Sequence, residues 1–339
     1  MPESAERRRR LRVYGLLALG VLVLFLAGVA LLTMPGSSYR GEVEVTDEAD
    51  LQLAEELSRD VEMLAGTIGE RNVFRPDALD EAVVWIESEL RTAGLEPRRQ
   101  SYQVRGVECH NIEVEIPGRE RPDEIVIIGA HYDSVMGSPG ANDNGSGVTA
   151  LLALARRLAQ GDPPARTLRL VFFVNEEPPF FTTPDMGSLV YARRSGERSE
   201  DIRAMLSLET IGYFDDEPGS QRYPLGLLRW FYPDRGDFIG FVGNLRSRSL
   251  LRSAIRAFRT EARVPSEGAA LPGFVPGVGW SDHWSFWQEG YPAIMITDTA
   301  PFRYPYYHTE EDTPDKLDYK RLAVVVRGLE KVVASLVRP

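Results

Sequence analysis

The chain has 339 residues, of which 43% are apolar and 26% are charged, a composition that supports a globular protein with a large hydrophobic core. Its 39 basic and 50 acidic residues give a formal net charge of −11, which argues against nucleic acid as a partner. The single cysteine, Cys109, excludes an intrachain disulfide framework.

The amino-terminal region contains an uncharged apolar stretch over residues 13–34, preceded by a cluster of five arginines. At about 1.5 Å rise per residue, a helix of this length covers the roughly 30 Å hydrocarbon core of a bilayer. We therefore expect one transmembrane helix over residues 13–34, with a basic cytoplasmic tail over residues 1–12 and the rest of the chain outside the cytoplasm. A cleaved signal peptide is the alternative, but its apolar region would be shorter.

The remainder of the chain is more acidic, because residues 35–339 hold 34 of the basic and 48 of the acidic residues, a net charge of −14. This charge disfavours nucleic acid and anionic lipid head groups and is compatible with divalent cations. Residues 35–45, with Gly and Ser near their start, are expected to form a linker. Residues 46–339 are expected to form one domain, since no second linker is evident.

The first elements of this domain are two helices and two strands. Apolar residues at helical spacing predict helices over residues 46–69, with Thr46 as the N-cap, and over residues 76–94. Residues 96–104 and 109–116 alternate apolar and polar side chains, as antiparallel strands with one solvated face do.

The central element is a short β-branched run, Ile125–Ile128, typical of a strand buried on both faces of a mainly parallel sheet. Helices and strands alternate after it, which predicts an α/β fold: a mixed, mainly parallel sheet flanked by helices. Strands are expected over residues 167–175, 205–213, 238–242 and 293–297, and helices over residues 148–158, 187–194, 249–262, 284–289 and 315–337. Residues 215–237, rich in Pro, Gly and aromatic residues, are expected to form a loop that walls a pocket.

Potential metal ligands follow the strands of this sheet. His131 and Asp133 come directly after the central strand, and Asp143 lies in a Gly, Ser and Asn-rich segment that we expect to be irregular. Ligands of open α/β sheets bind at the carboxyl ends of strands, and imidazole with carboxylates is a donor set that suits zinc. The sequence therefore predicts a metal site at this edge.

Further candidates follow the later strands: Glu176 and Glu177, then Glu209, then His308 in the loop after the last strand. Two adjacent carboxylates repel one another unless a cation lies near them. Any one of these residues alone is more often structural, but the coincidence of several at strand ends favours a site. His110 is expected to be structural, and His283 is expected to support the site without binding metal.

Six motifs, in this order, resemble the motif series of the M28 family of zinc peptidases over about residues 46–339: GAHYDSV, ANDNGSG, FFVNEE, LETIGY, SDHWSF and YYHTEEDTPDKLD. The resemblance implies a zinc-exopeptidase fold with two zinc ions that share Asp143. It implies that the first ion is held by His131, Asp143 and Glu209, and the second by Asp143, Glu177 and His308. Glu209 stands where many relatives have Asp.

The same resemblance implies that Glu176 is the general base and that Asp133 hydrogen-bonds His131 and sets its tautomer. Tyr307, directly before His308, is either a donor to the developing oxyanion or a packing residue of the aromatic run around it. The apolar segment Pro178–Phe181, with Trp230, Phe231 and Trp280, predicts a pocket for a bulky hydrophobic residue.

These observations favour a membrane-anchored metallo-aminopeptidase that hydrolyses amino-terminal residues from short peptides. Two alternatives stay open at this point. One is a glutaminyl-peptide cyclotransferase, which resembles the same motifs but uses a single zinc ion. The other is a non-catalytic binding ectodomain on a peptidase scaffold, although such proteins have typically lost ligands or the base.

Overall fold

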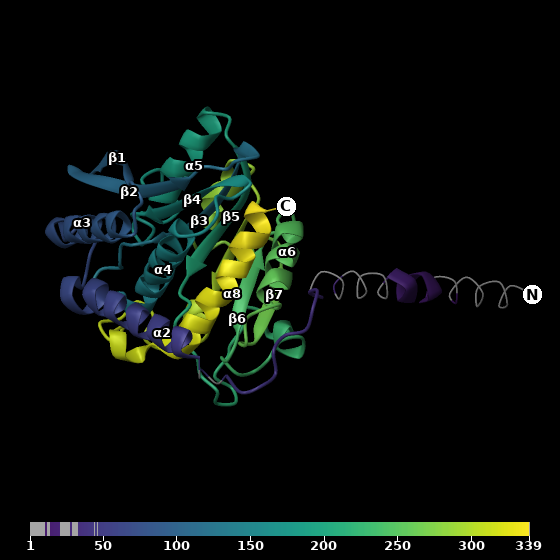
Figure 1. Cartoon of the computed structure of the whole chain (residues 1–339). Helices are drawn as coiled ribbons and strands as arrows, with labels where there is room; N and C mark the ends of the chain where they lie inside the picture. Colours follow the sequence, from purple (N-terminus) through teal and green to yellow (C-terminus); the bar gives the residue numbers. More distant parts are fainter. Residues whose placement is uncertain are drawn as a thin grey trace, which may run out of the picture.

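A computed structural model describes residues 11, 14–20, 28, 33–43, 45 and 47–338 (Figure 1). The predicted cytoplasmic tail except Leu11, more than half of the predicted transmembrane helix, and the predicted N-cap Thr46 lie outside the described residues. Among the residues that are described, no helix combines the length and the apolar character needed to cross a bilayer.

The described residues form one sheet of eight strands in the order β1-β2-β4-β3-β5-β8-β6-β7. Strands β4, β3, β5 and β8 are mutually parallel, β7 is parallel to β6, and the remaining neighbours are antiparallel. The mixed, mainly parallel sheet is therefore confirmed. The strands are β1 (Arg98–Val104), β2 (Val107–Ile116), β3 (Arg121–His131), β4 (Arg166–Phe173), β5 (Asp201–Glu209), β6 (Ile239–Gly243), β7 (Ser266–Ala270) and β8 (Ala293–Thr297).

Helices cover both faces of the sheet (Figure 1). One face packs on α2 (Glu48–Val61), α3 (Pro76–Thr92), α4 (Gly147–Ala159), α6 (Arg248–Phe258) and α8 (Tyr319–Val337). The other face packs on α5 (Gly187–Glu197) and α7 (His283–Gln288). Shorter turns are η1 (Glu62–Ile68), η2 (Ala141–Ser146), η3 (Gly226–Trp230), η4 (Ala300–Phe302) and η5 (Pro314–Lys316).

Strand β3 occupies the middle of the sheet and is buried on both sides, as its β-branched run predicts. Val126 and Ile128 point into the core under α2, α3, α4, α6 and α8. Ile125 and Ile127 point into the second core under α5 and α7. Successive side chains of a strand face opposite sides, so one apolar run joins the sheet to both helical layers.

The extent of the first predicted helix is confirmed, because α2 continues through the π-helical turn η1 to Ile68. Its N-cap is Asp47, whose Oδ1 accepts the Ala49 N–H at 3.0 Å, so the prediction of Thr46 as the cap is wrong. Two strands also differ from what the sequence predicts. The middle of β2 has no solvated face, because it lies between two strands and beneath helices. Strand β7 was not predicted, since its sequence SEGAA lacks the β-branched and aromatic residues typical of strands.

The expected linker lies against the domain in the structure. Arg259, the residue that caps the carboxyl end of α6, donates from Nη1 to the carbonyls of Pro35 at 3.0 Å and Gly36 at 3.2 Å. The Ser266 N–H donates to Ser38 Oγ at 2.9 Å. Residues 33–43 therefore run along α6 and the edge strand β7.

Replacing Val126 by Ala should lower the free energy of unfolding by roughly 1.5–3 kcal/mol, because the side chain is fully buried in the central strand. The matched control is Val84→Ala on α3, where the side chain is 53% exposed and the expected change is within about 0.5 kcal/mol. Urea denaturation of both variants measures the difference. Equal losses would contradict the assignment of β3 to the centre of the core.

Candidate active site

The candidate ligands meet because four parallel strands end at one edge of the sheet. His131 is the last residue of β3 and Glu209 the last residue of β5, while Glu176 and Glu177 follow the end of β4. The register pairs His131 with Phe173, the last residue of β4, so these strand ends lie side by side. Residues far apart in the sequence are thereby brought to one place.

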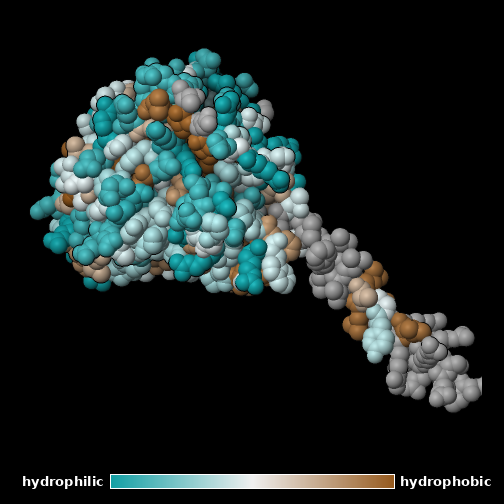
Figure 2. Space-filling view, turned by 90° about the horizontal axis from the view of Figure 1, so that it is seen from below, coloured by the Kyte–Doolittle hydropathy of each residue, from teal (hydrophilic) through white to brown (hydrophobic). Residues whose placement is uncertain are grey.

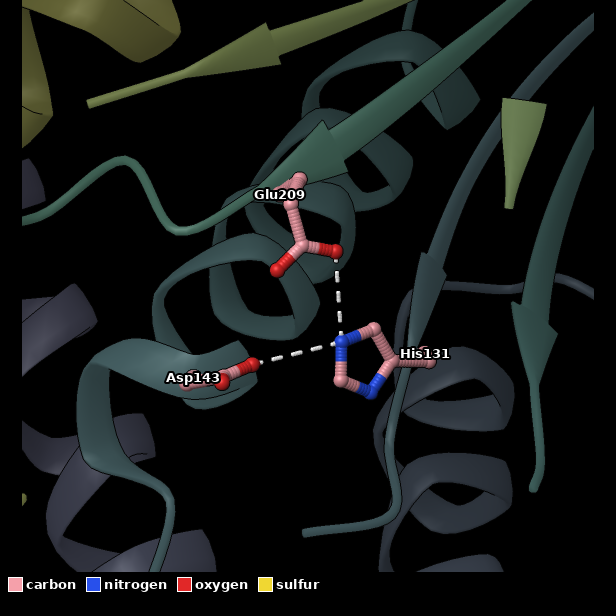
Figure 3. Close-up of side chains that lie close together, drawn as sticks. All are labelled: His131, Asp143 and Glu209. Atoms are coloured by element: carbon pink, nitrogen blue, oxygen red, sulfur yellow. Dashed lines mark ion pairs between the residues drawn. The ribbon is translucent and has the colours of Figure 1, made fainter. Parts of the chain in front are cut away.

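The first ligand group joins three buried side chains (Figure 3). The Nε2 atom of His131 lies 3.4 Å from Asp143 Oδ1 and 3.3 Å from Glu209 Oε2. His131 and Glu209 come from strand ends, and Asp143 comes from the η2 turn, where two residues leave helical geometry. The expected irregular segment is thus partly a distorted turn.

The second ligand group uses the other oxygen of the same aspartate. His308 Nε2 lies 3.1 Å from Asp143 Oδ2 and 3.1 Å from Glu177 Oε2. Asp143 therefore turns one carboxylate oxygen toward each group, which is the geometry expected of a bridging ligand.

Several atoms of these groups suit metal coordination. The Nε2 atoms of His131 and His308 and the Oδ2 atom of Asp143 are buried and form no hydrogen bond with any described residue. Within each group the three candidate ligand atoms all lie within 4.8 Å of one another. Buried polar atoms are nearly always satisfied, and two imidazoles with three carboxylates form a donor set that zinc prefers. The residues therefore fit two zinc ions.

The electrostatics of the site also favour bound cations. Burial raises the pKa of Glu177 to about 8, and the neighbouring Asp143 carboxylate adds to this shift. Burial likewise raises the pKa values of Glu176 and Glu209. Burial alone would lower the pKa of His131, but the Glu209 and Glu176 carboxylates raise it well above its usual value. A divalent cation would relieve this crowding of buried negative charge.

Asp133 makes more contacts than the sequence predicts. His131 Nδ1 lies 3.2 Å from the Asp133 carbonyl oxygen and 3.6 Å from its carboxylate, so the expected hydrogen bond to His131 is made by the backbone. The Asp133 carboxylate instead accepts the N–H groups of Glu176 and Glu177, each at 3.2 Å. Asp133 thus positions both glutamates relative to His131.

The two remaining predicted residues border the ligand groups. Glu176 is buried, and its Oε2 atom lies 3.8 Å from His131 Nε2. The ring of Tyr307 stacks on the ring of His308 with centroids 3.9 Å apart. The other two histidines belong to neither group: His110 is hydrogen-bonded to Ser101, and His283 Nε2 lies 2.8 Å from the Val278 carbonyl.

Arg71 is a structural residue of the site that sequence reasoning missed. It is fully buried and donates to the carbonyls of Tyr132 at 2.6 Å, Gly140 at 2.9 Å and Gly69 at 3.1 Å. Burial lowers its pKa to about 10, so the guanidinium stays charged at neutral pH beside the acidic cluster. No motif surrounds Arg71, and only its contacts with the segment between His131 and Asp143 reveal this role.

Two further residues were present in the quoted motifs without an assigned role. Asp312 accepts the N–H groups of Asn142 at 2.8 Å and Asp143 at 3.1 Å. Ser281 donates to Glu209 Oε2 at 2.8 Å. Both fix the orientation of a candidate ligand, and their positions in the YYHTEEDTPDKLD and SDHWSF motifs were the available signal.

A cavity of about 110 Å³, named here the apolar cavity, is bordered by the candidate ligand Glu209 and by Tyr307. The predicted loop over residues 215–237 supplies part of its wall, as expected. Its side walls and floor include Tyr223, Leu228, Tyr232, Phe238, Val242, Val278, Trp280, Met295 and Phe302.

Most of the predicted specificity residues do not line this cavity. Phe180 is buried and stacks on Phe74, with ring centroids 6.3 Å apart, while Phe181 lies beside Trp284. Trp230 and Phe231 are exposed and also lie outside the lining. Trp280 is the one member of that predicted set in the cavity wall. The error arises because the segment after Glu177 turns away from the β6 and β7 side of the site.

Comparison with known proteins gives a consistent result. The family model of Peptidase family M28 matches residues 111–333 of this chain. The uncharacterized protein YfbL of Escherichia coli (strain K12) is 40% identical over 283 residues, covering 81% of this chain and 86% of YfbL. Leucine aminopeptidase 1 of Arthroderma otae is 24% identical over 323 residues, covering 88% of this chain and 78% of the relative.

Solved structures share the fold. BSAP, a zinc aminopeptidase from Bacillus subtilis, superposes with a TM-score of 0.65 at 16% identity, covering 84% of this chain and 95% of BSAP. Fimbriiglobus ruber glutaminyl cyclase superposes with a TM-score of 0.62 at 17% identity, covering 88% of this chain and 99% of the cyclase. The fold and the site define a metal-dependent hydrolase of the exopeptidase class. The chain belongs to peptidase family M28.

Replacing Arg71 by Leu should lower the free energy of unfolding by about 3 kcal/mol or more, because several buried carbonyls lose their donor. The control is Arg75→Leu, which removes an arginine whose side chain is 65% exposed and which pairs with Glu70 at 3.4 Å. That change should cost less than about 1 kcal/mol. Denaturant unfolding distinguishes the two, and similar losses would contradict the role assigned to Arg71.

Zinc binding should release protons and weaken as the pH falls from 8 to 6. Without metal, Glu177 holds its proton below its raised pKa of about 8, and it must lose that proton to bind a cation. Titration calorimetry in two buffers of different ionisation enthalpy measures the proton release. His308→Ala should abolish zinc binding at the second ligand group only. A zinc affinity that does not change with pH between 8 and 6 would contradict the prediction that Glu177 is a ligand in this group.

Proposed function

We propose that this chain is a two-zinc aminopeptidase that removes amino-terminal residues from peptides. The observation that carries the proposal is the Asp143 carboxylate, whose two oxygens approach His131 at 3.4 Å and His308 at 3.1 Å, one from each ligand group. The aminopeptidases among the relatives and the structural neighbours support the same assignment.

When bound, a zinc pair lowers the pKa of a shared water and polarises the scissile carbonyl. The protein supplies the proton transfers. Glu176 lies beside the first ligand group and is held by the Asp133 carboxylate through its N–H at 3.2 Å. In this position it can accept the proton of the attacking water and give it to the departing amine.

Tyr307 is proposed to assist at the carbonyl oxygen. Its ring is fixed by stacking on His308, and it borders the apolar cavity together with Glu209. Its hydroxyl can donate to the oxygen on which negative charge develops. The cavity volume of about 110 Å³ exceeds by several times the space that one water requires, and therefore suits a single amino-terminal side chain.

We also propose that the amino-terminal apolar stretch anchors this domain to a membrane, with the domain outside the cytoplasm. The described residues Leu16, Leu17 and Leu19 are 69%, 60% and 56% exposed, and Figure 2 shows hydrophobic side chains in this segment beside a largely hydrophilic domain surface. Contact of such an apolar surface with water is unfavourable, and insertion into the hydrocarbon core of a bilayer would bury it.

Replacing Glu176 by Gln should reduce kcat for peptide hydrolysis by about 10²- to 10⁴-fold without loss of zinc, because the amide cannot accept the proton. Elemental analysis should find two zinc ions per chain in both proteins. Mass spectrometry of a mixed peptide library, before and after incubation, should show stepwise loss of amino-terminal residues. Glu120→Gln, at an exposed position, is the matched control and should leave kcat unchanged.

Two results would contradict this proposal. One zinc ion per chain with cyclisation of glutaminyl peptides would identify the cyclotransferase chemistry that the structural likeness to a glutaminyl cyclase leaves available. Full zinc occupancy with no turnover of the library would indicate a binding ectodomain instead.

A further inference from the structure

The floor of the apolar cavity is a row of four residues on neighbouring strands. Glu209 of β5 pairs with Thr297 of β8, Thr297 pairs with Gly240 of β6, and Gly240 pairs with Glu267 of β7. Paired residues of a sheet point to the same face. Glu209 and Glu267 therefore project from the same side of the sheet, and all four residues line the cavity.

The distance between the two glutamates follows from the sheet. Neighbouring strands are spaced by about 4.8 Å, so the three steps from Glu209 to Glu267 separate their Cα atoms by about 14 Å. One carboxylate belongs to the predicted metal ligands and the other lies at the β7 side of the same cavity. A substrate residue held at Glu209 would thus direct its side chain toward Glu267.

The space between the two carboxylates is apolar. Gly240 contributes no side chain, and the adjacent row of the floor contains Met295, Val242 and Ala269. The wall residue Tyr232 uses its hydroxyl to donate to the Gly268 carbonyl at 2.8 Å, which leaves its ring to face the cavity. A long hydrocarbon stem can therefore be buried here.

Glu267 is half-buried and lies within 4 Å of no Lys or Arg nitrogen among the described residues. The nearby Arg259 is directed elsewhere, because its Nε donates to Ser266 Oγ at 3.0 Å and its Nη1 to the Pro35 carbonyl at 3.0 Å. Burial raises the pKa of Glu267, although the positive charge of Arg259, the Ser38 hydroxyl and the positive charge of Arg40 act in the opposite direction. Arg222 also lines the cavity, but it is exposed.

We propose that Glu267 is a specificity-determining residue that selects peptides beginning with Lys or Arg. The stem of the amino-terminal side chain lies in the apolar cavity, and its terminal cation binds the Glu267 carboxylate. A purely hydrophobic side chain of the same length would desolvate this carboxylate further without giving it an ionic partner, which is unfavourable. The inference rests on the proposed aminopeptidase function and replaces the hydrophobic preference expected from the sequence.

The test compares two tripeptides that differ only at the amino-terminal residue, lysine or norleucine, which share a four-carbon stem but not the ammonium group. The zinc-loaded protein should hydrolyse the lysine peptide with a kcat/KM about 10- to 100-fold higher, in line with a hydrogen bond between charged groups. In Glu267→Gln the ratio of the two kcat/KM values should fall to near one, because kcat/KM decreases for the lysine peptide and stays unchanged for the norleucine peptide. Glu261→Gln changes an exposed glutamate that pairs with Lys331 at 3.8 Å and lies outside the cavity lining, and it should keep the ratio.

A second variant tests whether the cavity receives the side chain at all. A Cβ added at Gly240 would lie 3.3 Å from the Thr297 carbonyl oxygen and 3.6 Å from its Cγ2, so Gly240→Val fills the floor once the neighbouring strand shifts by a few tenths of an ångström. This variant should lower kcat/KM about tenfold or more for both peptides, leaving their ratio unchanged. Undiminished hydrolysis by Gly240→Val would overturn the proposal.

Binding separates this inference from the proposed function. Titration calorimetry with free L-lysine and L-norleucine should give tighter binding of lysine to the zinc-loaded protein, and equal binding to Glu267→Gln. If neither peptide is hydrolysed but this difference is found, the aminopeptidase proposal fails and the role of Glu267 stands. If lysine and norleucine behave alike in the unaltered protein, or the difference survives in Glu267→Gln, the role of Glu267 is overturned.

Discussion

The site depends on the burial of several carboxylates at one edge of a sheet. Asp143, Glu176, Glu177 and Glu209 are almost completely removed from solvent and lie around two imidazoles. Such a cluster is unfavourable unless cations compensate its charge, since desolvation and mutual repulsion both oppose ionisation. The buried guanidinium of Arg71 balances part of this negative charge. The negative charge that remains unbalanced is the physical reason why the ligand groups fit divalent metal ions.

The same sheet connects the chemistry to the selection of substrate. The strand order places β8 and β6 between the predicted ligand Glu209 and the edge strand β7, and their short side chains at this level leave room for a cavity. Residues 33–43 lie along β7 and contact it through Ser38. The segment 33–43 therefore covers the edge strand β7 next to Glu267. Covering an edge strand in this way prevents its free N–H and C=O groups from pairing with another chain.

Much of the fold could be predicted from local patterns. The β-branched run of β3 has the burial expected on both faces, and β8 begins and ends as expected at Ala293 and Thr297. Predictions failed where neighbours decide the outcome. β2 alternates in sequence yet is covered on both sides, and β7 has weak strand propensity but is held by pairing with β6. Propensity is a weaker determinant than tertiary packing at such positions.

The sequence by itself determined the types of the predicted ligands and their positions after strands, because donor chemistry and strand periodicity are local properties. Only the tertiary structure decided that Asp143 faces both ligand groups, that Arg71 binds the loop before it, and that Glu267 shares a row with Glu209. These relations depend on strand register and on contacts between distant segments. Register and long-range packing are set by the whole domain, and therefore no single segment encodes them.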